Sequence, residues 1–143
     1  LADKLNISEQ ITNFGYKEMG TELFNIYRNA DIFTMPTKFD TFPRTITEAM
    51  GNSLPVIATR VGGIPYRLEN DDNAVLIEPG DSVAMGKAVK RVVRDGELRR
   101  RLIREGRKLA EQNTLETQSK KMMSELEKYI EKPISAQSAD KES

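Results

Sequence analysis

Cysteine and histidine are both absent from this sequence of 143 residues. Without cysteine there is no disulfide framework and no thiolate metal site. Without histidine the commonest general base, the commonest metal ligand and the usual near-neutral pH switch are missing. Any catalysis must therefore use carboxylates, lysine, arginine, hydroxyls or backbone groups, and no metal cofactor is expected.

Long apolar runs are also missing. No run approaches the ~20 residues that a membrane-spanning helix needs, and we expect no signal peptide. These absences predict a soluble cytoplasmic protein. At this length one domain with a core of moderate size is expected.

A net charge is lacking as well, because 22 basic side chains balance 22 acidic ones. The balance hides an asymmetry, since the stretch from Lys87 to Lys108 holds 10 basic residues and only 3 acidic ones. Such a block suits a weak contact with an anionic membrane surface such as the cytosolic face, or it is an ordinary solvated helix surface. We expect no nucleic-acid partner.

Short apolar runs bounded by proline or glycine predict four strands, at residues 11–14, 31–36, 55–59 and 74–77. Apolar residues at helical spacing predict helices at residues 21–29, 43–52, 81–95, 98–110 and 114–129. Asp81 and Thr114 are expected N-caps, and Gly96 is expected just past a helix end. Alternating strands and helices predict an α/β fold with a mostly parallel sheet and C-terminal helices. The polar tail at residues 133–143 is expected to be disordered.

Ligands of such sheets bind beyond the carboxyl ends of the strands. That rule selects the loops at residues 15–17, 37–45 and 60–65. In the second loop, Asp40 lies eight residues before Glu48, and the loop enters a helix whose N-terminus favours a phosphate. A carboxylate beside such a site can accept hydrogen bonds from vicinal sugar hydroxyls. Taken alone, Asp40 is more typical of an ordinary turn residue and Glu48 of an ordinary helix-surface residue.

Residues 40–50 are followed by a Leu-Pro-Val-Ile-Ala-Thr strand, a Gly-Gly turn at Gly62 and Gly63, and Pro79-Gly80-Asp81 before a helix. In order and spacing this resembles the C-terminal, donor-binding domain of retaining glycosyltransferases with two Rossmann-like domains, the glycosyltransferase family-four group. The hallmark of that family is a Glu, seven residues and a second Glu, followed by Ala-Met. The resemblance covers roughly residues 11–130 and implies a partial Rossmann-like parallel sheet of about four strands.

The resemblance also implies roles for individual residues around a nucleoside diphosphate sugar. Asp40 and Glu48 match the two acidic residues of the catalytic site, which contact the donor hexose and the ribose hydroxyls respectively. The remaining substrate-binding positions are the hexose-facing Thr41 and Phe42, the diphosphate-facing Arg44 and Thr45, the base-binding Gly15, Tyr16 and Lys17, and Gly62 and Gly63 in the cleft. For the glycine pair a simple tight turn is an equal alternative. Asp40 is one methylene shorter than the Glu of the family, which shortens its reach to the sugar.

A complete enzyme of this family has an N-terminal acceptor domain and two earlier donor-domain strands that carry an Arg and a Lys, all expected upstream of Leu1. Residues 1–132 are therefore expected to be a truncated sugar-nucleotide-binding domain that does not catalyse transfer alone. Without those strands, residues 31–35 are expected to form an unprotected apolar sheet edge.

Three functional hypotheses stay open on the sequence. The first is the donor-binding half of a retaining glycosyltransferase that moves a hexose to a glycan, lipid or small-molecule acceptor. The second is a non-catalytic sugar-nucleotide-binding module or an inactive fragment. The third is a surface-binding protein that uses the basic block from Lys87 to Lys108.

Overall fold

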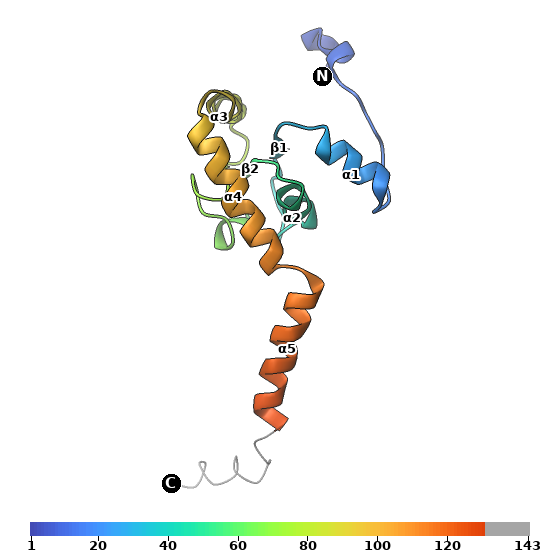
Figure 1. The fold of residues 1–143 in the computed structure, drawn as a ribbon. Coiled ribbons are helices and arrows are strands. Elements are labelled where there is room, and N and C mark those ends of the chain that lie inside the picture. The colour runs from blue at the N-terminus through green and yellow to red at the C-terminus, as the bar shows by residue number, and fades with distance from the viewer. Residues whose placement is uncertain (131–143) are drawn as a thin grey trace.

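The computed structural model describes residues 1–130, so the tail predicted at residues 133–143 and the boundary at residue 132 lie outside the described residues. The elements follow in chain order (Figure 1): α1 Thr21–Arg28, β1 Phe33–Met35, α2 Arg44–Gly51, β2 Val56–Thr59, β3 Val75–Ile77, α3 Ser82–Arg94, α4 Gly96–Gln112 and α5 Leu115–Ile130. Short 3-10 helices span Asp3–Leu5, Ser8–Gln10 and Ile64–Tyr66.

The sheet has three strands in the order β1-β2-β3, and both pairs are parallel. Phe33 lies opposite Val56, and Ile57 lies opposite Val75. All four residues of β2 are buried, as expected for the central strand of a sheet that is covered on both faces. The predicted α/β class is confirmed, and β1 is an edge strand, as expected.

The strand predicted at residues 11–14 is wrong. This segment belongs to no sheet, and the side chains of Ile11 and Phe14 are each 54% exposed. Apolar alternation favours a strand only where a neighbouring strand completes the hydrogen-bond ladder and a core covers the apolar side. Neither is present around residues 11–14, so the sheet has three strands and not about four.

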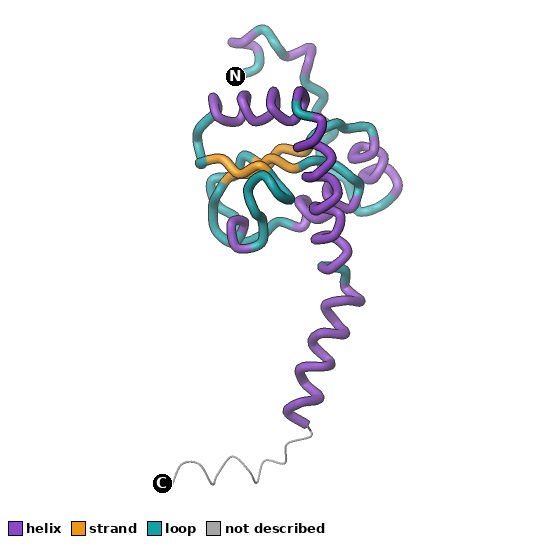
Figure 2. Tube along the Cα trace, turned by 60° about the vertical axis from the view of Figure 1, so that its left-hand side comes forward, coloured by secondary structure: helices purple, strands orange, loops and turns teal. Residues whose placement is uncertain are grey.

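Helices pack on both faces of the sheet, and Figure 2 shows the strands at the centre of the body among helices and loops. Helix α2 packs on one face, where Ile46, Ala49 and Met50 join Val56 and Ala58 in one apolar cluster. Helix α3 and the first half of α4 pack on the other face, around Ile57. Successive residues of β2 thus face opposite layers, which is the alternation that a strand imposes.

Two helix boundaries differ from the sequence-based expectation. Gly96 lies just past the end of α3, as expected, but it also begins α4 earlier than predicted, because the Asp95 carboxylate accepts a hydrogen bond from the amide of Leu98 at 2.9 Å and caps the new helix. Pro43 is the N-cap of α2 and not its first helical residue, with φ −70° and an extended ψ of 135°. The predicted cap at Asp81 is confirmed by its hydrogen bond with the amide of Ala84 at 2.7 Å.

Helix α5 extends away from the body (Figure 1), and none of residues 115–129 is buried. The apolar stripe predicted for this helix is formed, but Leu115, Met122, Leu126 and Tyr129 are all exposed. Within residues 1–130, no helix combines the length and the apolar character needed to cross a bilayer.

Candidate functional site

The loop between β1 and α2 is tied to the carboxyl end of the sheet by Thr59, the last residue of β2. The buried Thr59 Oγ1 donates to the carbonyl oxygen of Thr37 at 2.5 Å and approaches that of Met35 at 3.3 Å. The hydroxyl fixes where the loop leaves the sheet, so it has a structural role at the edge of the predicted cleft.

Gly62 and Gly63 press directly against the same loop. The amide of Gly63 donates to the carbonyl oxygen of Asp40 at 3.3 Å. A Cβ atom on Gly62 would lie 1.7 Å from the carbonyl oxygen of Asp40, and one on Gly63 would lie 1.7 Å from that of Thr41. The loops that follow β1 and β2 are therefore in backbone contact. A tight turn alone does not account for this approach, since each glycine leaves room for a carbonyl group of the other loop.

Arg67 holds the next residue of the loop, Phe42. Its guanidinium carbon lies 5.2 Å from the centre of the Phe42 ring, in the range of a cation–π contact. The same guanidinium donates to the Asn113 side-chain oxygen at 2.6 Å. Arg67 thus links the loop to the end of α4. Sequence reasoning missed this link, because the three residues are far apart in the chain and no spacing rule joins them.

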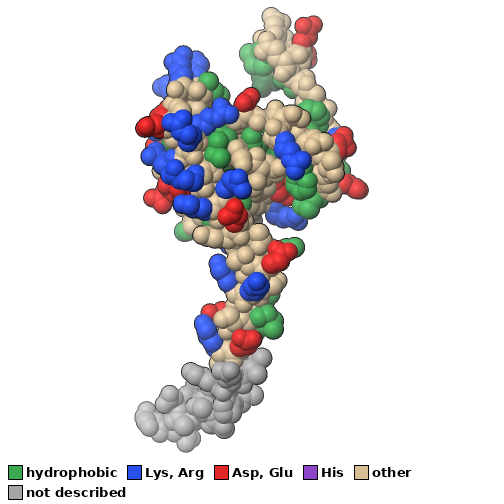
Figure 3. All heavy atoms as spheres, in the orientation of Figure 1, with side chains coloured by type: hydrophobic (Ala, Val, Ile, Leu, Met, Phe, Trp, Pro, Cys, Tyr) green, Lys and Arg blue, Asp and Glu red, His purple; other side chains and the backbone are tan. Residues whose placement is uncertain are grey.

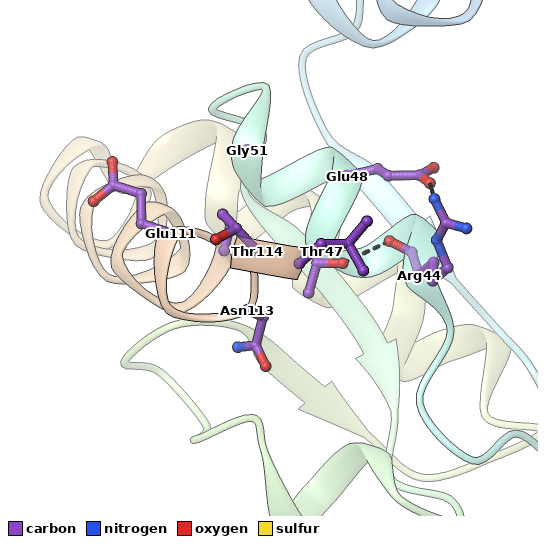
Figure 4. Close-up of a pocket in the computed structure, with 9 residues that line it drawn as sticks. Arg44, Thr47, Glu48, Gly51, Glu111, Asn113 and Thr114 are labelled. Carbon is purple, nitrogen blue, oxygen red and sulfur yellow. Dashed lines mark hydrogen bonds and ion pairs between the residues drawn. The ribbon is translucent and has the colours of Figure 1, made fainter. Parts of the chain in front are cut away.

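The carboxylate of Glu48 is held by a partner from α1. The hydroxyl of Tyr27 donates to Glu48 Oε2 at 3.1 Å, and the Glu48 side chain is only 17% exposed. Arg44 lies one helical turn earlier, with its guanidinium 3.6 Å from Oε1 (Figure 4). Burial first, and then the charge and hydrogen bond of Glu48, raise the pKa of Tyr27 to about 12. The phenol therefore stays protonated at neutral pH and keeps donating to the carboxylate.

Sequence reasoning did not identify Tyr27 as a site residue. A signal was present, because a tyrosine on the apolar side of a helix must find a partner for its hydroxyl once it is buried. Tyr27 is 8% exposed and its ring packs against Phe33 at a centroid distance of 6.1 Å. The sequence does not reveal that the partner lies 21 residues away on α2.

The N-terminus of α2 has free hydrogen-bond donors. Pro43 provides no side-chain cap. Within residues 1–130 the amides of Arg44 and Thr45 have no hydrogen-bond acceptor, whereas the amide of Ile46 donates to the Pro43 carbonyl at 3.1 Å. Two open amides at the positive end of a helix dipole favour an anion such as a phosphate.

A cavity of about 480 Å³ opens on the outer face of α2 (Figure 4). One wall is formed by α2, the other by the junction of α4 and α5. Its lining residues are Arg44, Thr47, Glu48, Gly51, Ala110, Glu111, Asn113, Thr114 and Leu115. This volume is in the range of small-molecule sites. A second hollow, of about 210 Å³, lies beyond the strand ends near Pro36 and Ile77 and is smaller than that range.

The structure does not bring all predicted site residues together. The carboxylate of Asp40 has no hydrogen bond or ion pair with any residue that the structure describes, and it does not line the cavity beside Glu48. Gly15, Tyr16 and Lys17 are also absent from that lining. Lys17 instead pairs with Glu22 at 2.5 Å, and Tyr16 is 89% exposed. What the structure does bring together on α2 are the Glu48 carboxylate, which can accept hydrogen bonds from a diol, and the open N-terminal amides, which can bind a phosphate.

Curated proteins that are similar in sequence include glycosyltransferases. The D-inositol 3-phosphate glycosyltransferase of Saccharomonospora viridis is 32% identical over 111 residues, which are 78% of this chain and 26% of that protein. The N-acetyl-alpha-D-glucosaminyl L-malate synthase of Bacillus anthracis is 28% identical over 127 residues, or 89% of this chain and 32% of that protein. The chain therefore spans between a quarter and a third of the length of these curated relatives.

Solved structures match as well. The C-terminal domain of the glycosyl transferase group 1 family protein LpcC from Francisella tularensis superposes with a TM-score of 0.68 at 26% identity, over 78% of this chain and 57% of that one. Alr3699/HepE from Anabaena, solved with UDP, superposes with a TM-score of 0.79 over 89% of this chain and 35% of that one. Its 20% identity supports a shared fold alone. The family model for glycosyl transferases group 1 matches residues 1–109. Since that match covers most of the chain, the chain belongs to the glycosyl transferases group 1 family.

Proposed function

We propose that this chain is the donor-binding half of a retaining glycosyltransferase, which moves a hexose from a nucleoside diphosphate sugar to a glycan, lipid or small-molecule acceptor. The observation that carries the proposal is the Glu48 carboxylate, held by Tyr27 at a cavity one helical turn from the open amides of α2. Alr3699/HepE, which shares the fold, is solved with UDP and with UDP-glucose, and the proposal carries a donor of this chemical class over to this chain.

The proposed roles follow from the chemistry of each group. Glu48 accepts hydrogen bonds from the ribose 2′- and 3′-hydroxyls, using the oxygen that Tyr27 leaves free. The amides of Arg44 and Thr45 bind the diphosphate, which gains charge as its bond to the anomeric carbon breaks, so they stabilise the leaving group. Asp40 orients the hexose together with the backbone amides of Thr41 and Phe42.

Retention requires the acceptor oxygen to bond to the anomeric carbon on the face that the diphosphate leaves. The electron pair of the broken bond stays on the diphosphate, and the acceptor hydroxyl proton can pass to it. In this scheme Asp40 is a positioning group and not a base. Gly15, Tyr16 and Lys17 are proposed to lie near the nucleobase. Transfer also needs an acceptor side and further cations at the diphosphate, so we do not expect this chain alone to catalyse it.

Calorimetric titration of the chain with uridine, guanosine and adenosine diphosphates, and then with their hexose derivatives, tests the proposal. One nucleotide should bind, and its sugar derivative should bind more tightly. Asp40→Ala should remove the gain from the hexose and leave the affinity for the nucleotide unchanged. A single hydrogen bond to a charged group contributes about 1.5–3 kcal/mol, so the loss should be roughly tenfold or more.

Asp72→Ala is the matched control for Asp40→Ala, because it removes another loop carboxylate from outside the site. It should leave both affinities unchanged. If a folded chain binds none of the three nucleotides, the proposed function is wrong. If the chain binds the nucleotide but Asp40→Ala does not alter hexose recognition, only the role of Asp40 is wrong.

Non-catalytic sugar-nucleotide binding is a second candidate function. Asp40 stands where the family carries a longer Glu, and its carboxylate has no partner among the described residues that would fix it toward a sugar. A module that has lost the hexose contact of Asp40 would bind the nucleotide and its hexose derivative equally well. The same titration therefore separates the two candidates, since only the enzyme needs the hexose to add affinity.

Tyr27→Phe should weaken nucleotide binding by roughly fivefold, because it removes a hydrogen bond of about 1 kcal/mol that orients Glu48. The remaining ring should still pack against Phe33. The decisive measurement is the ratio of affinities for the nucleoside diphosphate that binds and for its 2′-deoxy form, which should fall toward one when the ribose acceptor is less well positioned. A purely structural role would lower stability and leave this ratio unchanged. Tyr66→Phe, at an 89% exposed tyrosine, is the control and should change neither quantity.

A further inference from the structure

The outward face of α3 carries only basic and apolar side chains. Ala88 and Val92 are buried against the sheet. The opposite side of the helix carries one stripe of residues at intervals of three or four, which are Val83, Lys87, Lys90 and Arg94. We call this stripe the α3 basic face. No acidic residue occurs within Ser82–Arg94.

The basic residues of α4 are placed differently. Arg104 and Lys108 both pair with Glu105, at 2.6 and 2.7 Å, and Arg107 approaches Glu111 at 3.7 Å. On the α3 basic face, Lys87, Lys90 and Arg94 form no ion pair within residues 1–130. Arg100 and Arg101 of α4 also have no ion pair within these residues, so α4 is a surface of mixed and partly paired charge, whereas α3 carries positive charge alone. Figure 3 shows the basic side chains gathered on the side of the body where these two helices lie.

The surroundings of these charges favour a lipid surface over a nucleic acid. Val83 and Val93 are 66% and 60% exposed and lie beside the lysines, so apolar side chains accompany the positive charge. Residues 82–112 contain no aromatic side chain on which a base could stack. A helix that combines lysine and arginine with exposed apolar residues suits the boundary of an anionic bilayer.

We propose that the α3 basic face docks on an anionic lipid surface. The assignment rests on the charge complementarity between this face and anionic lipid head groups. Its three cations, which are Lys87, Lys90 and Arg94, have no acidic residue in their own helix. Docking there leaves the donor site open, because α3 and α2 cover opposite faces of the sheet. The inference stands independently of the proposed donor site, and either can fail without the other.

Co-sedimentation of the whole chain with vesicles of equal parts phosphatidylcholine and phosphatidylglycerol tests the proposal. Binding is expected at low salt, and it should fall at high salt and with vesicles of phosphatidylcholine alone, because screening weakens the attraction. The triple variant K87Q/K90Q/R94Q should weaken binding by a factor on the order of one hundred. The control R104Q/R107Q/K108Q removes the same charge from α4 and should change binding only severalfold. Circular dichroism checks that both variants are folded.

Each contrary outcome overturns the proposal. The first such outcome is that the wild-type chain does not bind the anionic vesicles. The second is that both triple variants lose binding equally, and the third is that binding is the same at low and at high salt. A duplex oligonucleotide serves as the competing ligand in the same buffer. If the chain binds that duplex and not the vesicles, and K87Q/K90Q/R94Q abolishes the interaction, the surface recognises nucleic acid and the lipid assignment is wrong.

Discussion

Gly63→Ala is expected to destabilise the fold and to displace the loop that carries Asp40. The added Cβ would lie 1.7 Å from the Thr41 carbonyl oxygen, whereas Cβ atoms essentially never approach another heavy atom to within 3.0 Å. The obstacle is backbone, so no rotamer change relieves it. Overpacking of this kind costs about 1–3 kcal/mol. The hydrogen bond from the Gly63 amide to the Asp40 carbonyl should be lost as well.

Thermal unfolding followed by circular dichroism measures this cost, and Tm should fall by roughly 5–10 °C. Gly62→Ala should act in the same direction, because its φ of +53° adds backbone strain to the collision with Asp40. Calorimetry should show weaker binding of a nucleoside diphosphate sugar, since the displaced backbone belongs to the hexose-facing loop.

Gly86→Ala is the matched control for both glycine variants. Gly86 lies within α3, and a Cβ there would meet no atom within 4 Å. Alanine is favoured over glycine in a helix by about 0.5–1 kcal/mol, so this variant should be as stable as the wild type or more stable. A Gly63→Ala protein with unchanged Tm and unchanged donor binding would contradict the role we give the glycine pair.

The elements that the sequence predicted well are those whose signals are local. The run of β2 is apolar up to its last residue, Thr59, and begins just after a proline, and all its residues are buried. The helix after Asp81 has an apolar face at helical spacing and an N-cap, and both are present in the structure. Periodicity and capping depend on neighbours in the chain, so they can be read without knowing the fold.

Contacts between distant residues account for what could not be predicted. The segment at residues 11–14 has the alternation of a strand, but a strand also needs a partner that no local pattern supplies. Asp95 was not predicted as an N-cap. The same residue is the C-cap of α3 and the N-cap of α4, and the sequence pattern indicated only the end of the first helix there. The glycine pair, Tyr27 and Arg67 act on the loop and on α2 from other parts of the chain. The rule for strand ends correctly selected the loops after β1 and β2, which are in contact, but it gave neither the contacting atoms nor the separate position of residues 15–17.

Glu48→Ala is expected to weaken nucleotide binding by roughly 30- to 150-fold. The proposed bonds from two ribose hydroxyls to a carboxylate together contribute about 2–3 kcal/mol. The carboxylate already has one fixed oxygen, because Tyr27 donates to Oε2 at 3.1 Å, so little ordering is needed when the ribose binds. Titration with UDP should show the loss. Titration with 2′-deoxy-UDP should show a smaller one, because that nucleotide lacks one of the two donors.

Two further variants separate ribose recognition from simple destabilisation. Glu48→Ala leaves the buried hydroxyl of Tyr27 without its acceptor, which itself costs about 1–3 kcal/mol of stability. Glu48→Gln keeps an acceptor for Tyr27 but removes the negative charge, so it should fold normally and still bind UDP severalfold more weakly. Glu111→Ala removes a carboxylate from the other wall of the same cavity and should leave binding unchanged. If Glu111→Ala weakens binding as much as Glu48→Ala does, the cavity recognises its ligand by overall charge, and the ribose assignment of Glu48 fails.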